Sequence, residues 1–195
     1  MKKLTFIIGL PGSGKTTLFE SWRKKDKSLI SYEDWMRWDI LDSNKKFKDD
    51  DRYNELIYNL QNNNLFNNVF IISSIFCRED FLNESEQHLK SLLPDFQFNK
   101  IYFENNVNRA ITNLIHRDIK IGGKWILNEN NSPYYYGDHF HGGKVYEAQI
   151  NSTIELSQHY NIPSEYKPLS IKEMKGPKTR EDYIKTARKN LATRN

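Results

Sequence analysis

The sequence predicts an α/β fold in which a parallel sheet of four or five strands carries helices on both faces. Two observations support this prediction. Short apolar runs alternate along the chain with longer segments in which apolar residues recur at helical spacing. The first run, Leu4 to Ile8, is apolar at nearly every position, which is typical of a strand buried on both faces of a parallel sheet. At 195 residues the chain is long enough for one such domain, which we expect to span 1–195.

The expected elements alternate along the whole chain. The strand-like runs lie at 4–8, 29–31, 69–73 and 99–103, and a short extended piece near 166–169 is a candidate fifth strand. The expected helices lie at 16–25, 36–41, 53–60, 81–93, 107–117, 145–160 and 180–191. Pro94 ends the fourth of these helices because proline cannot continue a helix. The glycine-bearing stretch 118–144 is predicted to be irregular, and we expect it to form a lid and acceptor region.

A glycine-rich loop joins the first strand to the first helix, and its sequence is Gly9-Leu10-Pro11-Gly12-Ser13-Gly14-Lys15-Thr16-Thr17. The pattern G-x-x-x-x-G-K-[ST] between a strand and a helix indicates a phosphate cradle. Its glycines let backbone N–H groups converge on phosphate oxygens, and the helix N-terminus adds partial positive charge. We expect Lys15 to reach the β- and γ-phosphates of ATP and Thr16 to bind Mg²⁺, with Thr17 beside it. A chance glycine loop at a strand end is the alternative.

Ligands of parallel-sheet proteins lie at the carboxyl ends of the strands, so residues that follow strands are candidate site residues. Glu33 and Asp34 follow the second strand. A carboxylate there is placed to accept the proton of an attacking hydroxyl in phosphoryl transfer. The alternative is an acid that caps the helix expected at 36–41. Spacing alone leaves open which acid is the base and which is the cap.

The third and fourth strands are followed by hydroxyl groups and arginines. No aspartate stands at the end of the third strand, where many nucleotide-binding folds hold the Mg²⁺ shell, but Ser73 and Ser74 can bond a metal-bound water. Arg78 is either a ligand of an acceptor phosphate or a surface arginine. Arg117 ends a helix beside the glycine-bearing stretch, and we expect it to stabilise the transferring phosphoryl group. Arg109, two turns earlier, is expected to be structural.

Other clusters allow more than one interpretation. Residues 133–143 contain Asp138, His139 and His141, but their spacing fits no standard zinc pattern, so we expect the aromatic rings there to pack or to stack on a base. Trp35 can stack on a base, although packing is the commoner role. The segment 172–195 carries eight basic residues against three acidic ones. It forms either a solvated helix face or a contact with a phosphate backbone.

Composition limits the class of partner and the compartment. A net charge of +4 and a pI near 9.0 fit an anionic partner such as a nucleotide or a nucleic acid. Cys77 is the single cysteine, which excludes an intramolecular disulfide and favours a reducing cytosol, bacterial or that of a phage-infected host. The first apolar run is too short for a signal peptide or a membrane span, so no membrane partner is expected. Nothing in the sequence indicates an oligomeric state.

The motifs together resemble the bacteriophage polynucleotide kinase family of P-loop kinases. Beyond the glycine loop, the matching motifs are Ile30-Ser31-Tyr32-Glu33-Asp34-Trp35 and the stretch from Ile71-Ile72-Ser73-Ser74 through Arg78. Asn113 to Arg117 resembles the helix that adjoins the lid in that family. The resemblance covers about residues 1–120. It depends mainly on the second and third motifs, because the glycine loop is common to many kinases.

The resemblance implies roles for individual residues. Glu33 would be the general base, Asp34 a supporting acid and Arg117 the transition-state arginine. Arg78 would lie near the acceptor. We also expect Ser74 and Trp35 on the acceptor side. The sequence departs from the family at two positions, because the family has aspartate where Glu33 and Ser74 stand. The chain has no phosphatase domain, so the resemblance implies no processing of 3′ ends.

These observations predict an ATP- and Mg²⁺-dependent kinase that phosphorylates a hydroxyl of a nucleic acid. The acceptor would be a 5′-OH end or a hydroxymethylated base of phage DNA, the latter a DNA modification. One alternative is a kinase of a small acceptor such as a nucleoside, a nucleotide or another metabolite. A second alternative is a nucleotide-switched binding protein without transfer activity, which the serine at position 74 favours. The sequence does not decide between ATP and GTP.

Overall fold

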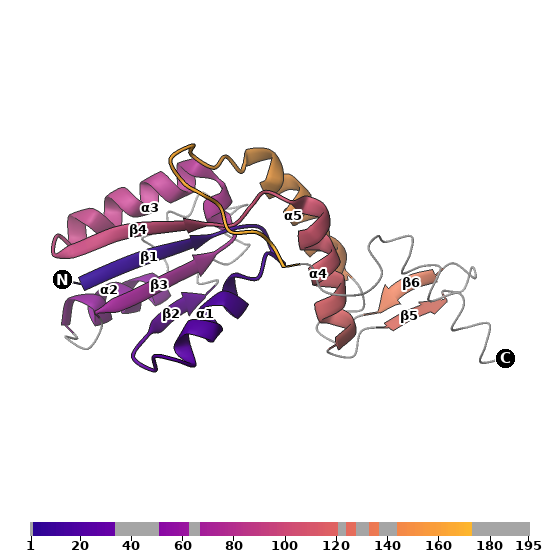
Figure 1. The fold of residues 1–195 in the computed structure, drawn as a ribbon, viewed down its shortest axis with the longest axis horizontal. Coiled ribbons are helices and arrows are strands. Elements are labelled where there is room, and N and C mark those ends of the chain that lie inside the picture. Colours follow the sequence, from indigo (N-terminus) through magenta and orange to yellow (C-terminus); the bar gives the residue numbers. More distant parts are fainter. Residues whose placement is uncertain are drawn as a thin grey trace.

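The computed structural model describes residues 2–33, 51–62, 67–120, 124–127, 133–136 and 144–172. Its centre is a parallel four-stranded sheet with the strand order β2-β3-β1-β4 (Figure 1). The strands are β1 (Lys2–Ile8), β2 (Ile30–Glu33), β3 (Asn68–Ser73) and β4 (Phe96–Tyr102). The first strand lies inside the sheet, which explains its apolar sequence. This architecture confirms the predicted α/β class.

Helices connect the strands, as parallel pairing requires. They are α1 (Lys15–Arg23), α2 (Asp51–Asn62), α3 (Glu79–Leu92), α4 (Val107–Lys120) and α5 (Lys144–His159), and the 3-10 turn η3 (Ile75–Cys77) precedes α3. Apart from the candidate fifth strand, every predicted strand and helix within the described residues is present, with its ends shifted by at most three residues. The helices expected at 36–41 and 180–191 lie outside the described residues.

Aromatic contacts show that helical elements cover both faces of the sheet. The ring of Phe70 lies 5.3 Å from that of Phe19 and 5.6 Å from that of Trp22, both on α1. On the other face, Phe6 meets Phe76 of η3 edge to face at 5.1 Å. Phe6 and Phe70 point to opposite faces because Phe70 pairs in register with Thr5, the residue before Phe6. The predicted arrangement of helices on both faces is therefore confirmed.

The stretch predicted to be irregular contains two strands. β5 (Lys124–Leu127) and β6 (Pro133–Tyr136) pair antiparallel as a two-stranded sheet, which Figure 1 shows apart from the main sheet and beyond the end of α4. The expectation of wholly irregular structure was therefore wrong. The glycine pairs suggested loops, but the Trp-Ile-Leu and triple-tyrosine runs have high strand propensity and pair with each other.

The expected fifth strand appears as a short extension of the sheet. Leu169 forms a parallel bridge with Phe103, directly after β4. The amide of Leu169 donates to the carbonyl of Tyr102 at 2.8 Å, and the amide of Glu104 donates to the carbonyl of Leu169 at 2.8 Å. The chain after α5 thus returns to the end of the sheet from which the glycine loop departs.

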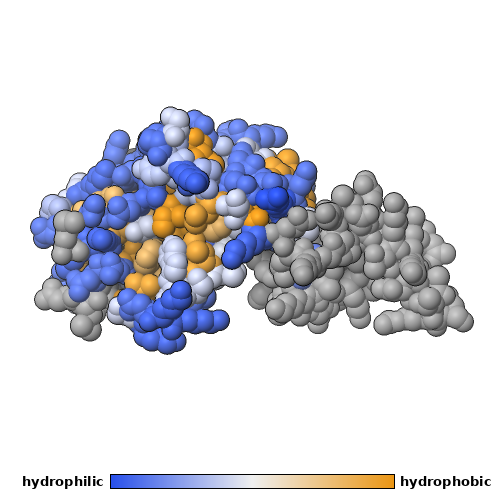
Figure 2. Space-filling view, in the orientation of Figure 1, coloured by the Kyte–Doolittle hydropathy of each residue, from blue (hydrophilic) through white to orange (hydrophobic). Residues whose placement is uncertain are grey.

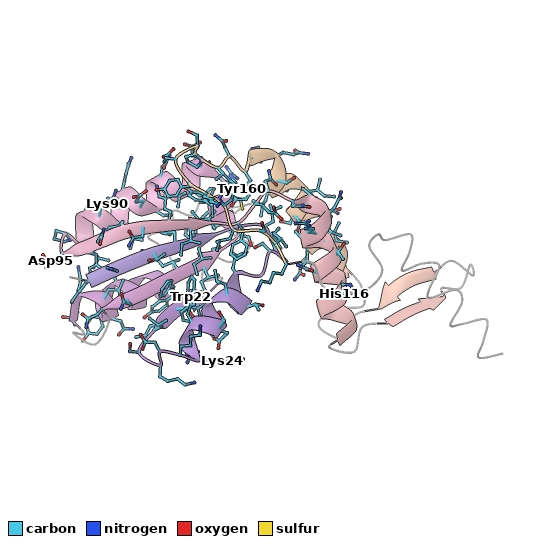
Figure 3. The ribbon with its side chains drawn as sticks, in the orientation of Figure 1. Trp22, Lys24, Lys90, Asp95, His116 and Tyr160 are labelled. Carbon is cyan, nitrogen blue, oxygen red and sulfur yellow. The ribbon has the colours of Figure 1, made fainter. Side chains whose placement is uncertain are left out.

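Tyr160 fastens the end of α5 to this same end of the sheet. Its hydroxyl lies 3.2 Å from the carbonyl oxygen of Ile8 and 2.5 Å from that of Phe103, and its ring is 6% exposed. In Figure 3 the labelled side chain lies where the strands converge on the glycine loop. Burial raises the pKa of the Tyr160 phenol well above its usual range, so the hydroxyl remains a donor. One side chain therefore holds the C-terminal ends of β1 and β4 together.

The surface over the sheet is mixed in character. In Figure 2, apolar residues gather over the middle of the sheet and hydrophilic residues surround them. Among the described residues no helix has both the length and the apolar composition that a membrane crossing needs.

Replacing Tyr160 by phenylalanine tests the importance of this anchor. The change removes the hydroxyl that donates to the buried carbonyl of Phe103, whereas the carbonyl of Ile8 keeps its hydrogen bond from the amide of Phe103 at 2.8 Å. We therefore expect the free energy of unfolding to fall by about 1–3 kcal/mol in urea titrations. Tyr58→Phe is the matched control, because Tyr58 is 67% exposed. Equal effects of the two substitutions would show that the hydroxyl of Tyr160 does not anchor α5.

Candidate phosphate-binding site

The glycine loop between β1 and α1 has the backbone conformation that its sequence predicts. Gly12 has a φ of 79° and Gly14 a φ of 95°, a region that other residues adopt only with strain. At Gly12 there is no room for a side chain, since a Cβ would collide with the carbonyl oxygen of Ala110 and lie 2.9 Å from Cγ of Leu114. At Gly14 a Cβ would meet nothing within 4 Å, so only the backbone angle requires glycine there.

Lys15 lies folded back over the loop and is only 8% exposed. Its ammonium donates to the carbonyl of Gly9 at 2.8 Å, to that of Leu10 at 3.0 Å and to Oγ of Ser74 at 2.8 Å. These hydrogen bonds hold the ammonium of Lys15 against the backbone of its own loop. They also bring Ser74, which directly follows β3, into contact with Lys15, and its predicted role toward a metal-bound water or an acceptor stays a prediction.

Ser13 provides a sign that the loop is completed by a ligand. Its backbone amide closes the first turn of the loop by donating to the carbonyl of Leu10 at 3.1 Å. Its hydroxyl is buried and, within the part of the chain that the structure describes, has no hydrogen-bond partner. Buried polar groups are nearly always paired, so this oxygen calls for a bound water or ligand group. A phosphate in the loop would supply one.

The N-terminus of α1 adds to the attraction for anions. The helix begins at Lys15, so its first amides and the positive end of its dipole lie at the loop. Thr16 and Thr17 stand exposed on this first turn, where a hydroxyl is accessible to a bound cation. Among the described residues there is no group of three or more histidine, cysteine or acidic side chains that could hold a metal. Asp138, His139 and His141 lie outside those residues.

The structure places the backbone of two predicted catalytic residues. Glu33 ends β2 in register with Ile72, so it reaches the carboxyl edge of the sheet beside the end of β3. Arg117 lies in α4, one turn beyond Asn113, on the helix that adjoins the loop. Asp34, Trp35 and the side chains of Glu33 and Arg117 are outside what the structure describes. Their predicted roles stay predictions.

The two other arginines considered in the sequence analysis, Arg78 and Arg109, form ion pairs. Arg78 donates to both carboxylate oxygens of Asp80, at 3.3 and 2.8 Å, and its guanidinium lies 4.7 Å from the centre of the Phe81 ring. These hydrogen bonds hold the pKa of Asp80 below its usual value. Arg109 donates to Glu104 at 2.9 Å, in keeping with its expected structural role. Contact between Arg78 and an acceptor stays a prediction.

Asn113 is a site residue to which the sequence analysis assigned no role. The side chain is 8% exposed, and its amide nitrogen donates to the carbonyls of Gly12 at 3.1 Å and Lys172 at 3.0 Å. Its sequence signal was a polar residue at helical spacing from Ala110 and next to Leu114, on the apolar face of a helix. A buried asparagine needs several partners, and these lie in segments far away in the sequence.

Cys77 lies beside the glycine loop, near the backbone amide of Gly9 and the ammonium of Lys15. It is 2% exposed, and burial raises the pKa of its thiol to about 12, although the charge of Lys15 and the backbone amide of Gly9 act in the opposite direction. The thiol is therefore protonated at neutral pH. It contributes an apolar wall to the site and no nucleophile.

No family model matches the sequence, and no curated protein matches it either. Several solved structures are similar to it in fold. A chain of the Pnkp1/Rnl/Hen1 RNA repair complex is 15% identical, with a TM-score of 0.41, over 82% of this protein and 46% of that chain. This protein therefore spans less than half the length of that chain.

Two further similar structures match over nearly their whole length. A kinase candidate from Chloroflexus aurantiacus is 15% identical, with a TM-score of 0.45, over 98% of this protein and 97% of that chain. A gluconokinase from Sinorhizobium meliloti 1021 is 12% identical, with a TM-score of 0.42, over 100% and 97%. At such low scores the assignment of function depends on the site itself.

Substituting Gly12 or Gly14 by alanine separates the cost of backbone strain from the cost of a steric collision. Both variants place a side chain at positive φ, which costs about 1–3 kcal/mol. Gly12→Ala adds a collision with α4, so we expect it to lower the free energy of unfolding more than Gly14→Ala does. Urea titration of the two variants measures the difference. Equal losses would contradict the tight contact between Gly12 and α4.

The buried thiol predicts a pH dependence of stability. The pKa of Cys77 is about 12 in the folded chain, against 9.0 ordinarily. Above pH 9 the unfolded chain therefore releases a proton that the folded chain keeps, so alkali favours unfolding. Between these values the free energy of unfolding should fall by about 1.4 kcal/mol per pH unit from this group. Urea titrations from pH 8 to 10.5 should show this extra slope in the wild type and not in Cys77→Ala.

Proposed function

We propose that this protein is an ATP-dependent kinase that transfers the γ-phosphate to a hydroxyl of a nucleic acid. The observation that carries the proposal is the conformation of the loop around Lys15. Gly12 and Gly14 have left-handed backbone angles, α1 begins at the loop, and the ammonium is held at the carboxyl end of the sheet. Such an arrangement is suited to a polyphosphate, since backbone amides, a helix N-terminus and a lysine all favour negative charge.

The residues present fit ATP and Mg²⁺. The buried hydroxyl of Ser13 and the amides at the start of α1 would bind phosphate oxygens, and Lys15 would move from the carbonyls of Gly9 and Leu10 toward the β- and γ-phosphates. Thr16 would hold Mg²⁺ through its hydroxyl. When bound, Mg²⁺ neutralises charge on the phosphates and orients them for transfer.

In the proposed reaction the acceptor oxygen forms a bond to the γ-phosphorus as the bond between that phosphorus and the β–γ bridging oxygen breaks. ADP leaves with the bonding electron pair. Glu33 or Asp34 accepts the proton of the acceptor hydroxyl, and Arg117 stabilises charge on the phosphoryl oxygens. Glu33 ends a strand at the same edge of the sheet as the loop, which is consistent with this role.

Charge supports a nucleic acid as the acceptor. The chain has a net charge of +4, and eight of its basic residues lie in the segment from Lys172 onward. Polyanion binding by such a segment is driven by counterion release. We further propose that residues 1–195 act as one kinase domain in which 118–144 forms the lid and acceptor region. Arg78, Ser74 and Trp35 are the proposed acceptor-side residues.

Transfer of γ-labelled phosphate to a panel of acceptors tests the proposal. The panel contains 5′-OH DNA, 5′-OH RNA, hydroxymethyluracil DNA, nucleosides and nucleotides. We expect label in a polymer, none with Lys15→Ala, and a loss of about 10²- to 10⁴-fold with whichever of Glu33→Gln and Asp34→Asn removes the base. Asp95→Asn is the matched control, because Asp95 is exposed just before β4, at the opposite end of the sheet (Figure 3).

The same assay separates the proposal from its rivals. Label found only in small acceptors would make the protein a metabolite kinase, and ATP binding without transfer to any acceptor would make it a nucleotide-switched binding protein. With a polymeric acceptor, binding should also weaken steeply as salt rises, whereas binding of a small acceptor should change little. Full transfer by Lys15→Ala would refute the mechanism altogether.

A further inference from the structure

One face of α4 forms a wall against the phosphate loop. Ala110, Asn113 and Leu114 stand at helical spacing i, i+3 and i+4, so they share that face. The backbone oxygen of Ala110 and the side chain of Leu114 lie so near Gly12 that they leave no room for a Cβ there. Asn113 lies between them, and its amide donates to the carbonyl of Gly12. The loop is thus packed and hydrogen-bonded against a helix that is distant in sequence.

The same amide group reaches a second segment. An asparagine side-chain nitrogen carries two protons. In Asn113 one donates to Gly12 and the other to the carbonyl of Lys172, at 3.1 and 3.0 Å. The two acceptors lie 101 and 59 residues away from Asn113 along the chain. Asn113 therefore joins the phosphate loop directly to the chain that returns after α5.

The returning chain is fastened along its length before it reaches this junction. Leu169 exchanges backbone hydrogen bonds with the end of β4, and the amide of Ile171 donates to a carboxylate oxygen of Glu104 at 3.0 Å. Ile171 is 2% exposed. We name residues 169–172 the return segment. Its last residue, Lys172, is the point at which it meets Asn113.

We propose that Asn113 is a positioning residue that couples phosphate binding in the glycine loop to the order of the return segment. The inference rests on the proposed nucleotide-binding function of the loop. Its physical basis is the rigid peptide unit between Gly12 and Ser13. The N–H of this unit donates to the carbonyl of Leu10, and its C=O accepts from Asn113. A phosphate that tightens the loop shifts this unit, and the shared amide carries the shift to Lys172.

The chain contains a matched control for this junction. Asn105 also uses its side-chain nitrogen to join two carbonyls, those of Ser157 at 2.8 Å and Tyr160 at 3.2 Å. It thereby ties the start of the α4 region to the end of α5 without contacting Gly12. Aspartate at either position keeps the shape, removes both donors and places a carboxylate against two carbonyls. Asn113→Asp and Asn105→Asp therefore make the same chemical change, the first at a buried side chain that touches the loop and the second at an exposed side chain elsewhere.

Hydrogen exchange read by mass spectrometry tests the coupling, with Mg²⁺-tripolyphosphate as the probe. Tripolyphosphate fills a phosphate loop but has no base or sugar to contact the return segment directly. In the wild type and in Asn105→Asp, we expect the probe to slow exchange in peptides covering 9–17 and also in those covering 166–172. In Asn113→Asp at a saturating concentration, the loop peptides should still be protected and the peptides covering 166–172 should not.

Binding affinity gives a second readout. Loss of one hydrogen bond to the loop should weaken tripolyphosphate binding by about tenfold in Asn113→Asp, and by less than about twofold in Asn105→Asp. Protection of 166–172 that persists in saturated Asn113→Asp would overturn the coupling while leaving the nucleotide-binding function intact. The coupling is also refuted if the wild-type loop is protected and 166–172 is not. If neither peptide group responds in the wild type and ATP does not bind, the proposed function itself is wrong.

Discussion

The site depends on one interaction, which is the burial of the Lys15 ammonium against the backbone of its own loop. A buried cation is unfavourable unless its donors are satisfied, and here two loop carbonyls and the hydroxyl of Ser74 accept from it. The carbonyls lie on the segment that leaves β1, and the hydroxyl lies just after β3. One side chain thus brings the loop and two neighbouring strands together. Because the acceptors of these three bonds are neutral, a polyphosphate offers the ammonium a stronger partner.

The second constraint is the close contact between the loop and α4. Gly12 packs against the backbone of Ala110, which holds the helix and the loop at a fixed separation. Because the loop and α4 lie so close together, the side-chain amide of Asn113 can donate to the carbonyls of both Gly12 and Lys172. Since α4 also carries the predicted catalytic Arg117, the helix that holds the loop in place is also the one expected to supply a charge to the reaction. This links the packing of the loop to its proposed chemistry.

Around this centre the buried ionisable groups are held neutral. Burial raises the pKa of the Cys77 thiol and of the Tyr160 and Tyr102 phenols, so all three are protonated at physiological pH. Cys77 touches the loop, and Tyr160 bonds the last carbonyl of β1, directly before it. A neutral, largely apolar surrounding strengthens the interaction of Lys15 and the helix N-terminus with a phosphate, because it screens charge less than water does.

The sequence alone determined the class of fold, the order of its elements within the described residues and the backbone conformation of the glycine loop. These follow from local patterns, namely apolar runs, helical spacing and glycines whose backbone angles other residues avoid. It also drew attention to the residues that follow the strands, among them Ser74, which contacts Lys15, because the end of a parallel strand adjoins a loop that leaves the neighbouring strand.

Only the tertiary structure decided which distant groups meet. The bridge made by Asn113, the anchor made by Tyr160 and the contact between Gly12 and Ala110 each join segments far apart in the chain. No local pattern contains such pairs, because a helix or strand forms on its own spacing whichever partner it later packs against. The strands β5 and β6 illustrate the same limit, since glycines near them suggested a loop and pairing between them produced a sheet.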